Sequence, residues 1–214
     1  VKWTPTHNYA APGDYVIKLT ASKRIGFGAS GVHNYSPTLA YAPKYDARNF
    51  VYSSSINKIE LGDAVWEFGN CAFMQCRNLQ SITMSTNLHG IGYGAFWGAD
   101  CLKYITIPSG RDYPSFNNGF QASGLRTIAL SKAITYIPNA FTSCSSLRFI
   151  PISNSVTDVS NLAFQSCSAL SSIIIPSGVT RIYSKTFDGC GGMAFYDFST
   201  HTTVPTLGDT NAFT

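Results

Sequence analysis

The sequence predicts a mainly-β solenoid, in which short coils stack their strands in parallel as a right-handed superhelix with an N-terminal β cap. Three observations predict it: a recurring phenylalanine, a set of apolar residues that recurs with it, and an alternation of apolar and polar residues within each set. Gaps of 23, 23, 24, 21, 23, 23 and 26 residues separate Phe50, Phe73, Phe96, Phe120, Phe141, Phe164, Phe187 and Phe213. A period in the low twenties is typical of units that bury their apolar side only against their neighbours.

Residues 1–48 are expected to form the N-terminal β cap and a linker. Pro12 and Gly13 favour a turn, and the run Tyr15–Leu19 that follows alternates as a strand does. Strands placed here would cover the apolar end of the solenoid. Residues 29–46 contain several Tyr, Pro and Ser, which indicates irregular structure between the cap and the coils.

Residues 49–214 divide into about seven units of ~23 residues. In the unit from Phe141, apolar or small residues follow at +3, +6, +9, +11, +15 and +18: Cys144, Leu147, Ile150, Ile152, Val156 and Val159. Positions +9 and +11 alternate with outward positions, which indicates a half-buried strand, and a proline such as Pro176 ends it. The spacing 0, +3, +6 predicts one tight helical or 3-10 turn, and positions +15 to +18 predict a second short strand.

Two units depart from this template. In the unit from Phe96 the cysteine stands at +5, as Cys101, and the polar segment 111–118 replaces the second apolar run. The unit from Phe120 is two residues short. We expect a bulge on one face as a result, and either a binding loop or relaxed sequence drift would account for it.

The pattern Ala-Phe-x-x-Cys-x-x-Leu-x-x-Ile-x-Ile-Pro-x-x-Val-x-x-Ile resembles the BspA-type leucine-rich repeat of treponemal and gut-bacterial proteins. The stretch Ala163–Phe187 follows it almost letter for letter, and the resemblance covers residues 49–214. The final stretch, Met193–Phe213, looks like the terminal repeat of gut-bacterial members. The resemblance implies a leucine-rich-repeat solenoid in a secreted or cell-surface bacterial protein with a role in adhesion, and it brings no catalytic residues.

The N-terminal stretch Trp3–Leu19 is similar to the last two strands of a PKD-type or immunoglobulin-like surface module. The similarity rests on His7 and Tyr9, followed by the run PGDYVIKL. A complete module of that kind needs more strands than fit here. The stretch is therefore either the remnant of such a module or the cap of the solenoid, and we favour the cap.

The cysteines are predicted to be core residues and not ligands. A reduced thiol behaves as a small buried hydrophobe, and stacked side chains point in parallel instead of toward one another. A zinc site is not expected, because no Cys-x-x-Cys pair is present. Cys71 and Cys76 are the pair that could form a local disulfide. The cysteines that share the +3 position are Cys76, Cys144, Cys167 and Cys190.

The predicted binding residues lie at the outward positions of the main strand, +8 and +10. These positions carry few charges in the middle of the chain and include large apolar groups. Exposed aromatic and aliphatic groups on a rigid sheet mark interaction surfaces, although cover by loops or by a neighbouring module is an equal alternative. The candidates are Tyr104, Phe149, Ile174 and Phe195.

A row of basic residues is the second candidate feature. Lys103, Arg126 and Arg148 come from three consecutive units and occupy the +7 position, which arrives one residue early in the short unit. Stacked like charges repel one another, which favours a purpose such as binding an anionic ligand or glycan. The alternative is an ordinary solvated row of charges.

Composition argues against several function classes. Charged residues make up 12% of the chain, and a formal net charge of +4 is too small and dispersed to favour nucleic acid. No apolar run is long enough to insert in a membrane. The His, Asp and Glu residues are scattered and form no known catalytic motif, so we expect no enzyme activity, no metal and no cofactor. The chain opens at Val1 without Met, and we expect it to be a segment of a longer protein.

Together these features favour a non-catalytic, extracellular or cell-surface protein of a gut bacterium that binds a protein or glycan on a host or microbial surface. Binding would use many shallow contacts on a preordered sheet. One alternative is a structural or receptor-binding component of a phage particle. The other is a carbohydrate-binding module with Tyr104, Phe149 and Phe195 as stacking platforms. The identity of the partner and the oligomeric state do not follow from the sequence.

Overall fold

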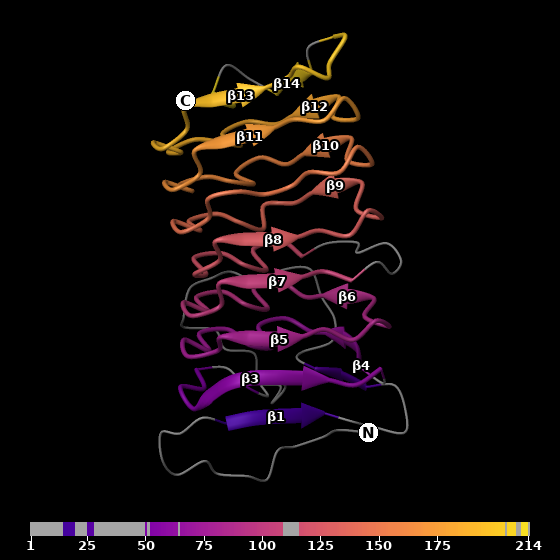
Figure 1. The fold of residues 1–214 in the computed structure, drawn as a ribbon, viewed down its shortest axis with the longest axis vertical. Helices are drawn as coiled ribbons and strands as arrows, with labels where there is room; N and C mark the ends of the chain where they lie inside the picture. Colours follow the sequence, from indigo (N-terminus) through magenta and orange to yellow (C-terminus); the bar gives the residue numbers. More distant parts are fainter. Residues whose placement is uncertain are drawn as a thin grey trace.

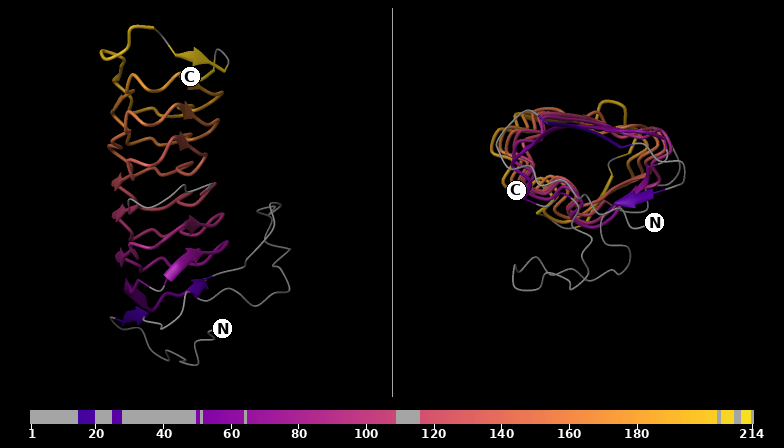
Figure 2. Two further views of the ribbon diagram at one scale, coloured as in Figure 1. Left: turned by 90° about the vertical axis from the view of Figure 1, so that its right-hand side faces the viewer. Right: turned by 90° about the horizontal axis from the view of Figure 1, so that it is seen from below.

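The structure, a computed structural model, describes residues 15–19, 25–27, 50, 52–63, 65–108, 116–203, 205–208 and 211–213. These residues form a stack of coils along one axis, with β1 at one end and β14 at the other (Figure 1). Seen along the axis, the coils overlie one another as a ring (Figure 2). Their strands form two columns, in which neighbouring strands pair in parallel.

The main column faces the viewer in Figure 1 and is built from the +8 to +10 positions. It consists of β1 (Tyr15–Leu19), β3 (Ile56–Leu61), β5 (Ser81–Thr83), β7 (Tyr104–Thr106), β8 (Thr127–Ala129), β11 (Ser172–Ile174) and β13 (Phe195–Asp197). Ile59 pairs with Ile82, and Ile105 pairs with Ile128. These isoleucines stand at +9, or one residue earlier in the short unit, and they are buried while their neighbours along the strands are not, as the alternation predicts.

The second column is built from the ends of the +15 to +18 runs. It consists of β2 (Ile25–Phe27), β4 (Val65–Phe68), β6 (Gly90–Ile91), β9 (Tyr136–Ile137), β10 (Asp158–Val159), β12 (Arg181–Ile182) and β14 (Thr206–Leu207). The +18 residues Ile91, Val159 and Ile182 are buried, so the short second strand also follows the predicted pattern.

The main column is interrupted at two places. Strands β5 and β7 belong to separate sheets, and no backbone hydrogen bond joins the described residues of these two strands. In the coil from Phe141, residues 149–151 form no strand, because Pro151 lacks the N–H that a ladder needs. The neighbouring coils still stay together there, since the amide of Arg148 donates to the carbonyl of Arg126 at 2.9 Å.

The segment from each phenylalanine to +6 forms separate hydrogen-bonded turns, and the described residues contain no helical or 3-10 segment of the kind predicted. In one unit the amide of Cys76 donates to Phe73 at 3.2 Å, and that of Leu79 donates to Cys76 at 3.1 Å. Cys71 and Gln75 flank this phenylalanine with φ of 58°, a left-handed conformation that stops a helix from continuing. The same conformation recurs two residues before or after the other phenylalanines, at Tyr52, Gly94, Gly98, Asn118, Ala122, Ser143, Leu162, Ser166, Lys185 and Gly189.

The recurring phenylalanines form one continuous stack in the core. From Phe73 to Phe187, successive rings are nearly parallel, with centroids 5.2–5.7 Å apart. Further rings pack edge-on against the stack: Phe68 lies 5.1 Å from Phe73, Phe116 lies 6.0 Å from Phe120, and Tyr196 lies 5.3 Å from Phe187. Phe116 is fully buried, although it belongs to the polar segment where the template predicted no apolar anchor.

The structure confirms the mainly-β solenoid. Strand β1 pairs in parallel with β3, and β2 pairs in parallel with β4, so both columns continue into the N-terminal region. The resemblance to a PKD-type module is not confirmed. The capping role, the domain boundary between residues 48 and 49 and the hand of the superhelix stay predictions. The expected linker 29–46 and most of the expected bulge, residues 111–115, lie outside the described residues.

Candidate interaction surface

The four predicted apolar candidates all lie on the outer face of the main column. The exposed fractions are 53% for Tyr104, 46% for Phe149, 50% for Ile174 and 57% for Phe195. Their neighbours along the chain at +9 and +11 turn inward, and Ile105, for example, is 1% exposed. The two-residue period of an extended chain therefore places large apolar groups in water on a surface whose other side is core.

The aromatic candidates occupy alternate coils of one row. Tyr104 pairs with Thr127 of the next strand, and Ser172 pairs with Phe195. Phe149 belongs to the coil between these two pairs of strands, because Phe141, with which that coil begins, stacks between Phe120 and Phe164. The row thus alternates an aromatic ring with a small hydroxyl side chain. Because coils rise about 4.8 Å, successive rings of the row lie roughly 10 Å apart along the axis.

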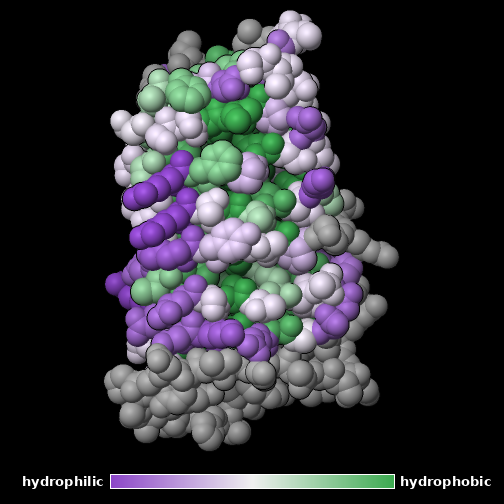
Figure 3. All heavy atoms as spheres, viewed as in Figure 1, coloured by the Kyte–Doolittle hydropathy of each residue, from purple (hydrophilic) through white to green (hydrophobic). Residues whose placement is uncertain are grey.

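The basic row borders this apolar row on one edge. The amide of Arg126 donates to the carbonyl of Lys103 and that of Arg148 to the carbonyl of Arg126, both at 2.9 Å, so the three residues come from adjacent coils. All three side chains are exposed. The Lys103 ammonium donates to the carbonyl of Asp100 at 2.6 Å, and neither arginine forms an ion pair with a carboxylate in the described part of the chain. Figure 3 shows this hydrophilic edge beside the hydrophobic centre of the face.

We name this area the outer face: the apolar row of Tyr104, Phe149, Ile174 and Phe195 together with the basic row. Near its N-terminal end, Lys58 and Glu60 form an ion pair of 2.8 Å, so charge there is balanced within one strand. The basic row lies next to β7 and β8, and neither of these strands contains a carboxylate that could balance its charge.

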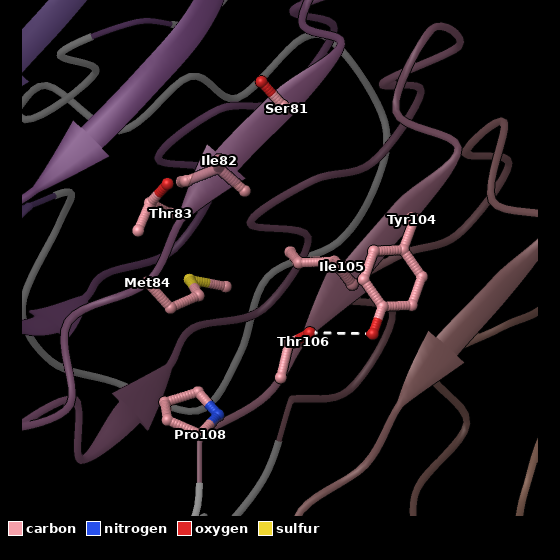
Figure 4. A pocket seen from close by; sticks show the side chains of 8 residues that line it. All are labelled: Ser81, Ile82, Thr83, Met84, Tyr104, Ile105, Thr106 and Pro108. Carbon is pink, nitrogen blue, oxygen red and sulfur yellow. Dashed lines mark hydrogen bonds between the residues drawn. The ribbon is translucent and has the colours of Figure 1, made fainter.

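A shallow recess of about 330 Å³ opens where β5 and β7 fail to pair. Hydroxyl groups of Ser81, Thr83 and Thr106 line it together with the ring of Tyr104, and apolar atoms of its remaining side chains form the floor (Figure 4). The Thr106 hydroxyl donates to the phenol oxygen of Tyr104 at 3.0 Å, which bends the ring back along β7. Sequence reasoning missed this recess, because nothing in the repeat marks the two strands as unpaired.

Large exposed groups also occur away from the outer face, where no binding residue was predicted. Tyr136 of β9 and Leu207 of β14 are 42% and 41% exposed and belong to the second column. Tyr52, 52% exposed, follows Phe50 in a left-handed turn. An outward position in the second strand was the signal that could have identified Tyr136.

No two cysteines form a disulfide in the structure, Cys71 and Cys76 included, and all of them except Cys101 are buried. Each buried thiol at +3 donates to the carbonyl of the phenylalanine one coil earlier, a role that the sequence did not reveal. Burial raises the pKa of Cys76 to about 12 and the pKa of Cys144 and Cys190 to about 11. Burial also raises the pKa of Cys167, with its thiol neighbours adding to the effect. These thiols are therefore protonated donors and poor nucleophiles.

The described residues bring together no group of three or more His, Cys, Asp or Glu side chains that could hold a metal. His201 was the nearest approach to a cluster in the sequence. Its Nε2 lies 3.2 Å from the carbonyl of Val179, and none of the described residues is a hydrogen-bond partner of its buried Nδ1. Asp197 instead accepts a hydrogen bond from the amide of Ser199 at 2.7 Å, and hydrogen bonds from Ser199 lower the pKa of that carboxyl. No helix in the described ranges is long and apolar enough to cross a bilayer.

The profile of the BspA type leucine rich repeat region matches the chain in six copies, over residues 44–113 and 114–194. These stretches make up more than two thirds of the sequence, and the chain belongs to the BspA-type leucine-rich repeat family. No curated protein sequence matches the chain.

Solved structures of bacterial leucine-rich repeat proteins share the fold. A leucine-rich repeat protein from Bacteroides ovatus is 23% identical with a TM-score of 0.64, over 83% of this chain and 46% of its own. One from Eubacterium ventriosum is 19% identical with a TM-score of 0.58, over 73% of this chain and 42% of its own. A leucine rich cell surface protein from Faecalibacterium prausnitzii is 21% identical with a TM-score of 0.52, over 71% of this chain and 53% of its own. The chain thus spans about half the length of these relatives.

Proposed function

We propose that the chain is a non-catalytic binding scaffold of a secreted or cell-surface bacterial protein, and that its outer face binds a protein partner. The observation that carries the proposal is the apolar row, in which three aromatic rings and one isoleucine stand about half exposed on the main column. Membership of a leucine-rich repeat family supports a role in protein interaction. A location at the cell surface is supported by the solved relative that is described as a cell surface protein.

The physical basis of binding is preorganisation. The outer face rests on strands whose +9 side chains are locked in the core, so binding orders little of the backbone. Phe149 and Phe195 offer large apolar areas that lose water on contact, which is typical of the residues that carry most of an interface's energy. The basic edge adds orientation and a faster encounter with an acidic partner more than it adds affinity.

The test is binding of the immobilised chain to a panel of purified extracellular-matrix, serum and microbial surface proteins. The surface variant combines Phe149→Ser, Ile174→Thr and Phe195→Ser. We expect the wild-type chain to bind at least one panel member and the surface variant to bind it about a thousandfold more weakly, because each of the three lost anchors weakens binding about tenfold.

The matched control variant combines Tyr136→Ser and Leu207→Thr, which remove exposed apolar groups from the second column. We expect it to bind as the wild type does. If the control variant loses as much affinity as the surface variant, or if the surface variant binds unchanged, the outer face is not the binding site and the proposal is wrong.

A further inference from the structure

The recess between β5 and β7 combines three properties that favour binding of a ligand. It is hollowed, with a volume of about 330 Å³. It is lined by hydroxyl groups and by an aromatic ring above apolar side chains, as Figure 4 shows. It also lies beside the start of the basic row, since Lys103 directly precedes Tyr104, the first residue of β7.

Tyr104 is held as a fixed platform. Its phenol oxygen accepts a hydrogen bond from Thr106, two residues along the strand, while 53% of the side chain stays exposed. A free exposed tyrosine would lose rotamer freedom when a ligand covers it. Here the strand has already restricted the ring, so a flat ligand that stacks on it loses less entropy. Pyranose rings have apolar C–H faces that stack on aromatic rings, and their hydroxyl groups suit the polar lining.

The basic row indicates the charge of a polymeric ligand that extends beyond the recess. The cations of Lys103, Arg126 and Arg148 come from successive coils, which rise about 4.8 Å. An acidic peptide matches the sign of these charges, but its acidic side chains offer no flat apolar ring to stack on Tyr104. A linear acidic polysaccharide carries acidic groups along its chain and also has pyranose faces that stack on an aromatic ring. The charge sign together with the aromatic platform therefore favours the polysaccharide.

We infer that the recess between β5 and β7 binds one pyranose ring of a linear acidic polysaccharide, with Tyr104 as the stacking platform and the basic row holding the acidic groups of the following sugars. This site goes beyond the protein partner proposed above and does not depend on it. The anionic group is a carboxylate, as in uronic acids, or a sulfate, and the experiment separates the two.

The experiment titrates the full chain with a hexasaccharide of galacturonic acid, with its methyl-esterified and therefore neutral form, and with a heparin-derived hexasaccharide that carries sulfates. We expect the acidic oligosaccharides to bind and the neutral one to bind at least tenfold more weakly. Tighter binding of the galacturonic acid form identifies carboxylate as the preferred group, and tighter binding of the heparin form identifies sulfate. Poly-glutamate serves as the peptide of like charge.

Two variants separate stacking from charge. Tyr104→Ala should weaken binding about tenfold without changing its dependence on NaCl, because it removes contact area and no charge. Replacing Lys103, Arg126 and Arg148 by Gln should remove most of the NaCl dependence, since screened ion pairs cause it. Thr106→Val keeps the shape of the side chain but frees the ring, and should weaken binding by a smaller factor of about three.

Tyr136→Ala is the control for loss of an exposed tyrosine and should bind as the wild type does. All substituted side chains except that of Thr106 are large exposed groups, so an unchanged thermal midpoint confirms that the variants are folded. The inference is overturned if neither acidic hexasaccharide binds the wild-type chain. It is equally overturned if poly-glutamate binds as tightly and Tyr104→Ala has no effect, because charge alone then explains binding. Loss of protein binding in the surface variant bears only on the proposed function.

Discussion

The thiol of Cys167 donates a hydrogen bond to the backbone carbonyl of Phe141, 26 residues earlier, at 3.1 Å. The same bond joins neighbouring coils at three other places: Cys76 to Phe50 at 2.8 Å, Cys144 to Phe120 at 2.9 Å, and Cys190 to Phe164 at 3.1 Å. The cysteine of the repeat is therefore more than a small apolar side chain. In these four units it links the coil to the one before it, next to the phenylalanine stack, where water has no access.

Replacing this thiol should destabilise the solenoid. We expect Cys167→Ala to lower the free energy of unfolding by about 1–2 kcal/mol, since it removes a buried hydrogen bond and leaves a small cavity. The measurement is urea denaturation followed by far-ultraviolet circular dichroism. Cys101→Ala is the matched control, because Cys101 is only half-buried, and it should change stability by less than about 0.5 kcal/mol. An equal loss in both variants would contradict the role assigned to the +3 thiol.

The raised pKa of the buried thiols predicts a loss of stability at alkaline pH. Burial raises the pKa of Cys144 from 9.0 to about 11, so above pH 9 the unfolded chain releases a proton that the folded chain keeps. The unfolded state then binds fewer protons, and the free energy of unfolding falls as pH rises from 9 toward 11. Urea midpoints at pH 7, 9 and 10 measure this. Cys144→Ala should show a shallower decline than the wild type over that range, and parallel curves would refute the assignment.

The phenylalanine stack should be the most sensitive part of the core. Phe164 is fully buried, and its ring lies 5.6 Å from that of Phe141 and 5.5 Å from that of Phe187. We expect Phe164→Ala to cost about 3–5 kcal/mol, because it opens a cavity between two rings that cannot close around it. Phe164→Leu, which keeps most of the volume, should cost less. The free energy of unfolding of both variants tests the order, and a smaller loss for the alanine variant would be inconsistent with the stack.

The left-handed residues offer a way to stabilise the protein. Ser166 adopts φ of 59° two residues after Phe164, and the corresponding residues Gly98 and Gly189 are glycines. Ser166→Gly should raise the free energy of unfolding by about 0.5–1 kcal/mol, because glycine takes this conformation without steric strain. Ser168→Gly, at an exposed position without left-handed φ, should lower it by a similar amount. The thermal midpoints of the two variants should therefore move in opposite directions.

Much of the fold and part of the candidate site were predictable from the sequence. The fixed offsets from each phenylalanine identified the inward residues of both strands, and the period of two placed Tyr104, Phe149, Ile174 and Phe195 outward. Two features were not predictable. The first is the conformation of the turns, which the spacing predicted to be helical. The left-handed φ that prevents a helix falls on residues such as Leu162, which rarely adopt it, so the sequence carries no signal for it. Phe116 was taken for part of a polar loop, although it fills the core opposite Phe120.

The sequence by itself determined that the chain is a solenoid and which side of each strand faces the core. It did so because burial in a repeat depends only on spacing along the chain, and spacing is visible in the sequence. Only the tertiary structure decided how adjacent coils meet. The recess between β5 and β7 and the hydrogen bond from a thiol to a carbonyl one coil away both depend on atoms that the chain brings together across about one repeat. The hydrogen bond from Thr106 to Tyr104 joins residues of one strand, but it depends on the side-chain conformation of both. Such contacts depend on distances of a few tenths of an ångström, which a residue pattern does not record.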